Sequence, residues 1–287
     1  MNVLVTGASG QLGSEMRVAV GGCADNYIFT DIADLDITSQ EEVDRAMRVL
    51  KVDVVVNCAA YTAVDMAEDE PLQAERINHH AVANLAKLCA KHDATLIHIS
   101  TDYIFDGTTD MPYTEESSAS PLSVYGRSKL AGEATIAESG CRAIIIRTSW
   151  LYSEFGSNFV KTMRSLTTSK PSLKVVNDQI GTPTYASDLA SVLVKIIERR
   201  MLDRCGVYNF SGEGECSWYE FAVEIARQSG NNHCTIEPCT SEEYSTKAVR
   251  PRYSVLDKNK IKATFGIEIE DWKIALGRCI DKLNATR

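Results

Sequence analysis

The chain has 287 residues, of which 44% are hydrophobic and 24% are charged, a composition typical of globular proteins of one large domain or two smaller ones. The formal net charge of −9 argues against binding to nucleic acids or anionic membranes. No apolar run approaches the roughly 18 residues of a membrane-spanning helix, and the first residues read as a strand rather than a signal peptide. We therefore expect a cytoplasmic protein with no nucleic-acid or membrane partner.

The chain begins with an apolar run, residues 2–6, followed by Gly7-Ala8-Ser9-Gly10-Gln11-Leu12-Gly13. Leu12, Met16 and Val20 then recur at helical spacing. Strand, glycine turn and helix form the context of a phosphate-binding loop, because glycines let the backbone approach a pyrophosphate and a helix N-terminus offers free N–H groups. The glycine spacing is G-x-x-G-x-x-G, one residue longer than the G-x-G-x-x-G fingerprint of dinucleotide-binding loops. The alternative to a phosphate-binding loop is a tight strand-to-helix turn that binds no ligand. The place of the loop at the start of an alternating pattern favours a dinucleotide.

An acidic residue ends the second predicted strand, residues 27–31. Asp31 lies 18 positions after Gly13, close to the spacing at which a carboxylate meets the adenosine ribose of a dinucleotide. A carboxylate there favours NADH over NADPH because it repels a 2′-phosphate. Asp34 and Asp36 compete for the same role.

The next segments continue the alternation of helices and strands. Ser39 with Glu42 predicts a capping box at a helix start. Residues 52–60 are nearly all apolar, as is typical of a central parallel strand covered on both faces. Residues 61–69 read as a loop, and a long helix follows from Pro71.

Two histidines, His79 and His80, fall inside this long helical run. On a regular helix they lie on different faces, and no third metal ligand is near in sequence, so structural or surface roles are predicted and no metal ligand is assigned. The nine cysteines contain no Cys-x-x-Cys pair and are expected to be reduced thiols.

Polar residues follow the fourth predicted strand, residues 95–99, in the order Ser100-Thr101-Asp102-Tyr103. Ligands of open α/β sheets bind outside the carboxyl ends of the strands, so these residues are candidates for a reaction site, with a plain surface loop as the alternative. Farther along, Tyr125-Gly126-Arg127-Ser128-Lys129 opens a helix that places Tyr125 and Lys129 on one face. A nearby ammonium favours the phenolate, so the pair can form a tuned acid. A surface helix that carries both by chance is the alternative.

Another apolar strand, residues 141–148, extends the pattern, which predicts the α/β class with a Rossmann-like doubly wound parallel sheet. We assign residues 1–150 to a dinucleotide-binding domain whose sheet is completed by about residues 185–212. Residues 151–184 and 213–287 are assigned to a smaller C-terminal lobe that binds the substrate.

These features together resemble the extended short-chain dehydrogenases/reductases. Longer blocks narrow the resemblance to the dTDP-4-dehydrorhamnose reductase family: NCAAYTAVD at 57–65, STDYIFDG at 100–107, PLSVYGRSKLAG at 121–132, RTSWLY at 147–152 and QIGTPT at 179–184. The similarity covers essentially the whole chain, with one departure at Cys58, where the family often has Ala. It implies the reduction, by NADPH or NADH, of the C4 keto group of a dTDP-4-keto-6-deoxysugar, giving dTDP-L-rhamnose.

The resemblance also implies roles for individual residues. Thr101 would steady the keto oxygen, Tyr125 would protonate the forming alkoxide, and Lys129 would lower the pKa of Tyr125 and hydrogen-bond the nicotinamide ribose. The other implied cofactor contacts are Gly7, Ser9, Gly10, Gln11, Leu12, Gly13, Asp31, Asp36, Ile37, Cys58, Ala59 and Ala60. The implied substrate contacts are Thr62, Val64, Thr101, Asp102, Tyr103, Trp150, Asn158 and Arg250, the last as a candidate partner of the pyrophosphate.

The family further implies a homodimer and, in some members, magnesium between subunits, for which no complete ligand set is identified. Two alternatives stay open: a non-catalytic nucleotide-binding regulatory subunit, and another sugar-nucleotide reductase, epimerase or dehydratase of the same fold. The presence of Thr101, Tyr125 and Lys129 together favours a catalytically active enzyme over the regulatory subunit. Tyr103, where dehydratases usually carry a second carboxylate, favours simple reduction.

Overall fold

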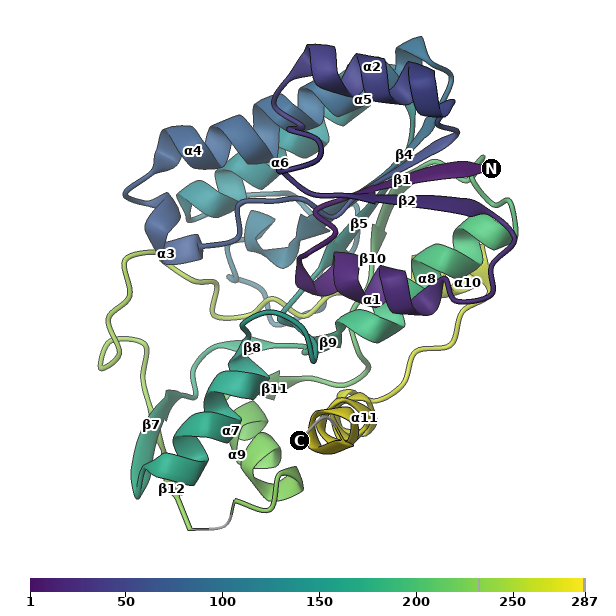
Figure 1. Ribbon diagram of the computed structural model, residues 1–287. Coiled ribbons are helices and arrows are strands. Elements are labelled where there is room, and N and C mark those ends of the chain that lie inside the picture. Colours follow the sequence, from purple (N-terminus) through teal and green to yellow (C-terminus); the bar gives the residue numbers. More distant parts are fainter. Residues whose placement is uncertain (232, 286–287) are drawn as a thin grey trace.

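The computed structural model describes residues 1–231 and 233–285, which form a larger and a smaller region (Figure 1). The larger region is built on a six-stranded sheet with the order β10-β5-β4-β3-β1-β2, and every neighbouring pair is parallel. Its strands are β1 (Asn2–Thr6), β2 (Asn26–Thr30), β3 (Val54–Asn57), β4 (Thr95–Thr101), β5 (Arg142–Thr148) and β10 (Gly206–Asn209). The predicted α/β class with a Rossmann-like parallel sheet is confirmed.

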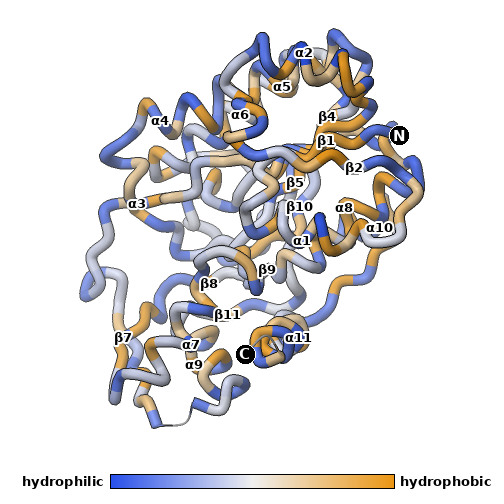
Figure 2. The backbone as a smooth tube through the Cα atoms, viewed as in Figure 1, coloured by the Kyte–Doolittle hydropathy of each residue, from blue (hydrophilic) through white to orange (hydrophobic). Residues whose placement is uncertain are grey.

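Helices cover both faces of this sheet, because alternate strand residues point to opposite sides. Val3 and Val5 of β1 join one buried apolar cluster, and Leu4 between them joins another. The first face is covered by α1 (Gln11–Ala19), α8 (Ala186–Glu198) and α10 (Asn259–Phe265). The second face is covered by α2 (Gln40–Leu50), α5 (Ala81–Lys91) and α6 (Val124–Glu138). Figure 2 shows the hydrophobic colour concentrated on the strands between these two layers.

The smaller region has an apolar cluster of its own, which joins α7 (Phe159–Ser169), α9 (Trp218–Gln228) and α11 (Trp272–Ala285). A separate parallel pair, β7 (Ser172–Val176) and β12 (Thr235–Cys239), packs against α9. Two short pairs complete the strands: β6 (Leu151–Tyr152) with β9 (Thr184–Tyr185), and β8 (Ile180–Gly181) with β11 (Cys216–Ser217). By contrast, α10 packs on the main sheet although it lies within the range expected to form the lobe.

The segment after β3 differs in detail from the expectation. The predicted loop 61–69 contains a short helix, α3 (Val64–Ala67). The predicted long helix consists of α4 (Pro71–Glu75), a π-helical turn η1 (Arg76–His80) and then α5. Among the described helices, none combines the length and the apolar character that crossing a bilayer requires.

Only half of the predicted capping box at α2 forms. The Ser39 hydroxyl accepts the backbone N–H of Glu42 at 3.3 Å. The Glu42 carboxylate, however, accepts the backbone N–H of Asp36 at 3.3 Å, because the backbone N–H of Ser39 already donates to the Asp36 carbonyl at 3.0 Å.

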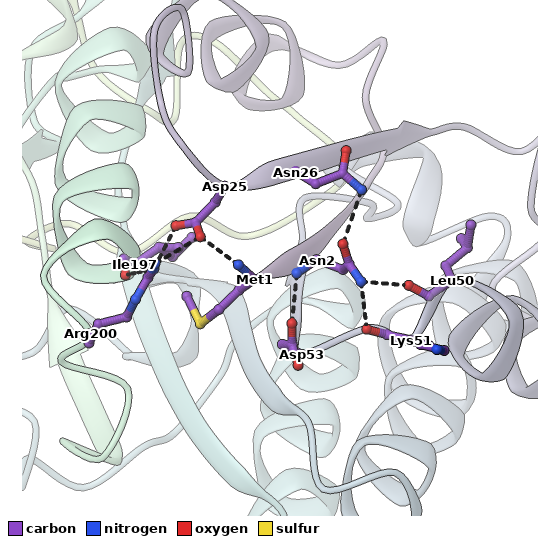
Figure 3. A network of polar contacts seen from close by, with 9 residues as sticks. All are labelled: Met1, Asn2, Asp25, Asn26, Leu50, Lys51, Asp53, Ile197 and Arg200. Carbon is purple, nitrogen blue, oxygen red and sulfur yellow. Dashed lines mark hydrogen bonds and ion pairs between the residues drawn. The ribbon is translucent and has the colours of Figure 1, made fainter.

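Polar contacts hold the amino ends of the strands (Figure 3). The backbone N–H of Asn2 donates to Asp53 at 2.7 Å, and its side-chain amide donates to the carbonyl of Leu50 at 2.9 Å. Asp25, just before β2, accepts hydrogen bonds from Arg200 at 2.5 and 2.9 Å, and this guanidinium lowers the pKa of Asp25 to about 2. The network therefore holds the amino ends of the strands in place. The predicted site residues gather at the opposite, carboxyl ends.

Candidate active site

The glycine-rich loop between β1 and α1 has the geometry of a pyrophosphate-binding turn. Gly7 has φ +65°, and Gly10 is the N-cap of α1. A Cβ on Gly7 would lie 2.6 Å from the backbone nitrogen of Ala59, so both the conformation and the space require glycine. The N–H groups at the start of α1 can therefore meet a phosphate closely.

A cavity of about 350 Å³ lies beside this loop. Eight of the predicted cofactor residues line it: Gly7, Gly10, Asp31, Asp36, Ile37, Cys58, Ala59 and Ala60. Six further lining residues were not predicted: Ile32, Leu35, Thr38, Gln73, Arg76 and Ile77. Small and apolar walls, carboxylates at the edge and a helix N-terminus suit an adenine dinucleotide.

The remaining predicted loop residues, Ser9, Gln11, Leu12 and Gly13, lie outside this lining. Leu12 is buried in the core of the sheet.

Asp31, the predicted ribose-binding residue, is held by the backbone. One carboxylate oxygen accepts the N–H of Ser9 and the other that of Ile32, both at 2.8 Å. Although burial opposes the effect, these N–H groups lower the pKa of Asp31. The carboxylate is therefore ionised and tied to the glycine-rich loop at neutral pH.

Arg76 places a positive charge at the outer wall of the same cavity. Its guanidinium donates to the Thr38 hydroxyl at 2.9 Å and lies 3.8 Å from the Asp36 carboxylate. The Asp36 carboxylate also accepts the Thr38 N–H at 2.9 Å. Arg76 has no motif in the sequence, and only the packing of η1 against the cavity reveals it.

The predicted acid and its partner meet where β4 and α6 come together. The Ser123 hydroxyl caps α6 by accepting the N–H of Gly126 at 3.1 Å. A Cβ on Gly126 would lie 2.2 Å from the carbonyl oxygen of Tyr103, so this glycine allows α6 to approach the 3₁₀ turn η2 (Asp102–Ile104). The approach places Tyr125 beside Thr101, whose hydroxyl is a hydrogen-bond partner of the phenol.

The expectation that Lys129 lowers the pKa of Tyr125 is wrong for this structure. Burial raises the pKa of Tyr125 to about 12, the Thr101 hydroxyl opposes the rise and the Asp102 carboxylate adds to it. The Nζ atom of Lys129 is engaged elsewhere, donating to the carbonyl of Ile99 at 2.6 Å. Burial also lowers the pKa of Lys129 to about 8, so this charge is itself readily lost.

His98, which sequence analysis did not single out, contacts Lys129 from β4. Its Nε2 atom lies 3.3 Å from the Nζ of Lys129, and its Nδ1 lies 3.0 Å from the Asn57 amide nitrogen. The Asn57 oxygen accepts the Thr6 hydroxyl at 2.7 Å, so its NH₂ group donates to Nδ1 and the neutral imidazole carries its proton on Nε2. Burial and the Lys129 charge in turn hold the pKa of His98 well below its ordinary value.

Asp102 is a second group able to hold a proton in this site. It is fully buried, and burial raises its pKa to about 7, against the opposing effect of the Ser254 and Thr101 hydroxyls. The Thr101 hydroxyl donates to the Asp102 carboxylate at 3.1 Å. Near neutral pH the carboxyl can therefore either donate or accept a proton.

A second cavity, of about 410 Å³, is connected to the site through Tyr103, although Tyr125 itself is not in its lining. The predicted residues Tyr103 and Arg250 line it, and the ring of Tyr103 meets that of Tyr125 edge-on at 5.7 Å. Arg250 donates to both oxygens of Asp65, at 3.1 and 2.6 Å, which shows the bidentate geometry that a pyrophosphate also accepts. Much of the lining was not predicted: Asp65, Phe159, Met163, Lys174, Val175, Val176, Gln179, Trp218, Tyr244 and Thr246.

Trp150 lies directly behind this lining. Its φ of +46° turns the indole onto Trp218, with ring centroids 3.6 Å apart and planes at 11°. Trp150 therefore supports the aromatic wall that Trp218 presents to the cavity.

Both linings also lack five further predicted substrate residues: Thr101, Asp102, Thr62, Val64 and Asn158. Asn158 caps α7 by accepting the N–H of Lys161 at 3.1 Å, and it donates to the Gln11 side chain at 3.0 Å. Thr62 is exposed, and Val64 begins α3. Asn158 and Gln11 thus join the glycine-rich loop to the smaller region.

A Rossmann-like sheet that delivers a threonine at one strand end, beside a tyrosine and a lysine one helical turn apart, assigns the chain to the extended short-chain dehydrogenases/reductases. Comparison with family models gives the family itself. The model described as "RmlD substrate binding domain" matches residues 1–285, and the chain belongs to this family.

Individual relatives agree with this assignment. The dTDP-4-dehydrorhamnose reductase of Aggregatibacter actinomycetemcomitans is 41% identical over 283 residues, which cover 96% of each chain. A crystal structure of a dTDP-4-dehydrorhamnose reductase from Clostridium acetobutylicum superposes with a TM-score of 0.95 at 43% identity, covering 99% of this chain and 100% of that one. The Bacillus anthracis enzyme of the same name, solved in complex with NADP, gives a TM-score of 0.93 at 36% identity over 98% and 99% of the two chains.

Proposed function

We propose that this protein reduces the C4 keto group of dTDP-4-dehydro-6-deoxy-L-mannose (dTDP-4-dehydrorhamnose) to give dTDP-L-rhamnose, with a nicotinamide dinucleotide as the cofactor. One contact carries the proposal: Tyr103 lines the larger cavity and its ring touches that of Tyr125. Tyr103 thus links the larger cavity, where we place the sugar nucleotide, to the ring of the proposed acid. The names of the relatives support the substrate class.

The residues around Tyr125 have the properties that a reduction requires. The nicotinamide, when bound, supplies the hydride. Tyr125 keeps its proton until an alkoxide forms, because burial raises its pKa to about 12. Thr101 orients the keto oxygen through the same hydroxyl that contacts the phenol. The role left for Lys129 is the one that the family implies at the cofactor, a hydrogen bond to the nicotinamide ribose. Asp102, which accepts from the Thr101 hydroxyl, can return a proton at neutral pH.

We propose that both NADPH and NADH serve as cofactors. The Asp31 carboxylate disfavours a 2′-phosphate, but two backbone N–H groups already bind it. Arg76 offers a cation at the wall of the same cavity, which favours a 2′-phosphate. The Bacillus anthracis relative was solved with NADP.

We extend four further features from the family as proposals. The first three are a homodimer, a cytoplasmic location and a bound magnesium ion. The fourth is that residues 151–184 and 213–287 form a lobe that binds the substrate, except that α10 within this range packs on the main sheet. Sedimentation with and without Mg²⁺ tests the first and third. A monomer under both conditions contradicts the dimer, and sedimentation unaffected by Mg²⁺ contradicts magnesium between subunits.

The direct test mixes the protein with the dTDP-4-keto sugar and follows the absorbance of NADPH or NADH. We expect oxidation of the cofactor that depends on the sugar, and a product identified as dTDP-L-rhamnose by NMR. The UDP-linked keto sugar and a mixture without sugar are the controls. Cofactor binding without oxidation would contradict the proposal and would favour the regulatory-subunit alternative.

A further inference from the structure

One π-helical turn, η1, separates α4 from α5 and changes which side chains share a face. In a regular α-helix consecutive residues lie about 100° apart, which would separate His79 from His80. A π turn bonds residue i to residue i+5 and takes up roughly one extra residue. Positions i+4 and i+5 then both lie above position i, so His79 and His80 gather over Glu75. The prediction that the two histidines lie on different faces is wrong for this reason.

The three side chains already form a close group. The Nδ1 atom of His79 lies 2.9 Å from the Glu75 carboxylate. The imidazoles of His79 and His80 are stacked, with centroids 4.6 Å apart and planes at 25°. One ligand atom from each of the three residues lies within 4.8 Å of the other two.

We propose that Glu75, His79 and His80 form a binding site for Zn²⁺ or a chemically similar divalent transition metal. Two imidazoles and one carboxylate, completed by water, are an established zinc ligand set. Zinc–nitrogen bonds of about 2.0–2.1 Å require the three atoms to move closer. The exposed ring of His80 and the half-buried ring of His79 can rotate to do so, and the metal takes the place of the proton between Glu75 and His79.

The opposite side of the same turn contacts both parts of the candidate active site. The buried side chain of Asn78 donates to the Ser128 hydroxyl of α6 at 3.0 Å and accepts the backbone N–H of Tyr61 at 2.9 Å. Arg76, at the start of η1, lines the dinucleotide cavity. A metal that ties the end of α4 to the end of the π turn therefore stabilises the register that presents Arg76 and Asn78 to these neighbours.

The test is calorimetric titration of the reduced full-length protein with ZnCl₂. We expect one saturable site whose affinity falls at least about 100-fold in His79→Ala and Glu75→Gln, because each removes a ligand. His92→Ala is the matched control, since His92 also pairs with a carboxylate, that of Asp44 at 2.7 Å, but stands outside the group. Zinc is also expected to slow hydrogen exchange of the amides of residues 76–80 in the wild type and not in His80→Ala.

Thiols are the main competitors for zinc, because Cys205 is exposed. Unchanged zinc affinity in all three ligand variants would overturn the proposal, as would loss of the site in Cys205→Ser. Circular dichroism establishes that each variant is folded before titration. His80→Ala, at an exposed position, keeps the test decisive if Glu75→Gln alters the helix.

Discussion

The dinucleotide cavity and the larger cavity are built from different parts of the chain and in different ways. The dinucleotide cavity is formed within residues 7–77, and at the glycine-rich loop its wall is backbone and small side chains such as those of Gly7 and Ala59. The larger cavity is formed by aromatic and charged side chains, among them Trp218 and Arg250, which come from distant segments. The position of a wall made of backbone is set by the fold, whereas a wall made of side chains can be altered by substituting a single residue. Mutations should therefore break the first cavity by displacing the chain and the second by deleting a contact.

The largest effect is expected at Tyr125, which lies in neither cavity lining but contacts Tyr103 of the larger cavity. A Tyr125→Phe variant should lose about 10²–10⁴-fold in kcat, because it removes the general acid and leaves the ring in place. Affinity for NADPH and for dTDP should stay within about twofold of the wild type, since neither cavity wall changes. Steady-state kinetics and fluorescence titration measure both quantities. A near-normal kcat would show that Tyr125 is not the acid.

Asp102, whose carboxylate accepts the Thr101 hydroxyl in the same site, should make stability depend on pH. Its pKa in the folded protein is about 7 against 3.8 for the free group, so the folded state binds the proton more tightly. The resulting stabilisation is complete below about pH 4 and is lost as the pH rises through 7, on the order of 3–4 kcal/mol. Urea denaturation at pH 5 and 7.5 should show a clear decrease in the wild type and a smaller one in Asp102→Asn.

Part of the pH dependence should survive in that variant, because burial also raises the pKa of Glu15 to about 7. An identical decrease in wild type and variant would mean that Asp102 is ionised in the folded protein across this range.

Gly7→Ala tests the backbone wall. The added Cβ meets the backbone of Ala59 at 2.6 Å, in a φ that disfavours alanine. We expect the free energy of unfolding to fall by about 1–3 kcal/mol and the affinity for NADPH to fall at least about tenfold, with dTDP affinity unchanged. Gly140→Ala is the control, because Gly140 has φ +70° and open space around its Cβ position. Equal loss of cofactor affinity in both variants would assign the effect to general destabilisation.

Arg250→Leu tests the side-chain wall. Deleting a charge-assisted bidentate contact to the pyrophosphate should raise KM for the sugar nucleotide about 10–100-fold, with NADPH affinity unchanged. Arg250→Lys should recover only part of the loss, because an ammonium cannot make both hydrogen bonds in one plane. An unchanged KM in the Leu variant would restrict Arg250 to its ion pair with Asp65.

The same difference in construction explains what the sequence could predict. The determinants of the dinucleotide cavity are local: Gly7, Asp31 and Ala59 each follow a strand in a recognisable pattern. Lys174 and Trp218, by contrast, read as ordinary members of a strand and a helix, and only folding brings them to the cavity of Tyr103.

Electrostatic properties were the least predictable part of the site. The spacing of Tyr125 and Lys129 suggests a lowered pKa for the phenol, but desolvation, which depends on the complete fold, raises it. His98 gave no signal for the same reason, since its role depends on a buried contact between β4 and α6.

The smallest effect is expected at Arg76, a long cationic side chain that is the only one among the described residues lining the dinucleotide cavity. Its side chain is 57% exposed, so Arg76→Ala should weaken NADPH binding by no more than about fivefold. NADH binding should not change, because the proposed partner of Arg76 is the 2′-phosphate. Parallel titrations with the two cofactors measure the difference. An equal loss of affinity for NADPH and NADH would mean that Arg76 contacts a part of the molecule that both cofactors share. A loss of NADPH affinity above about 100-fold would contradict the view that the backbone, rather than single side chains, forms this cavity.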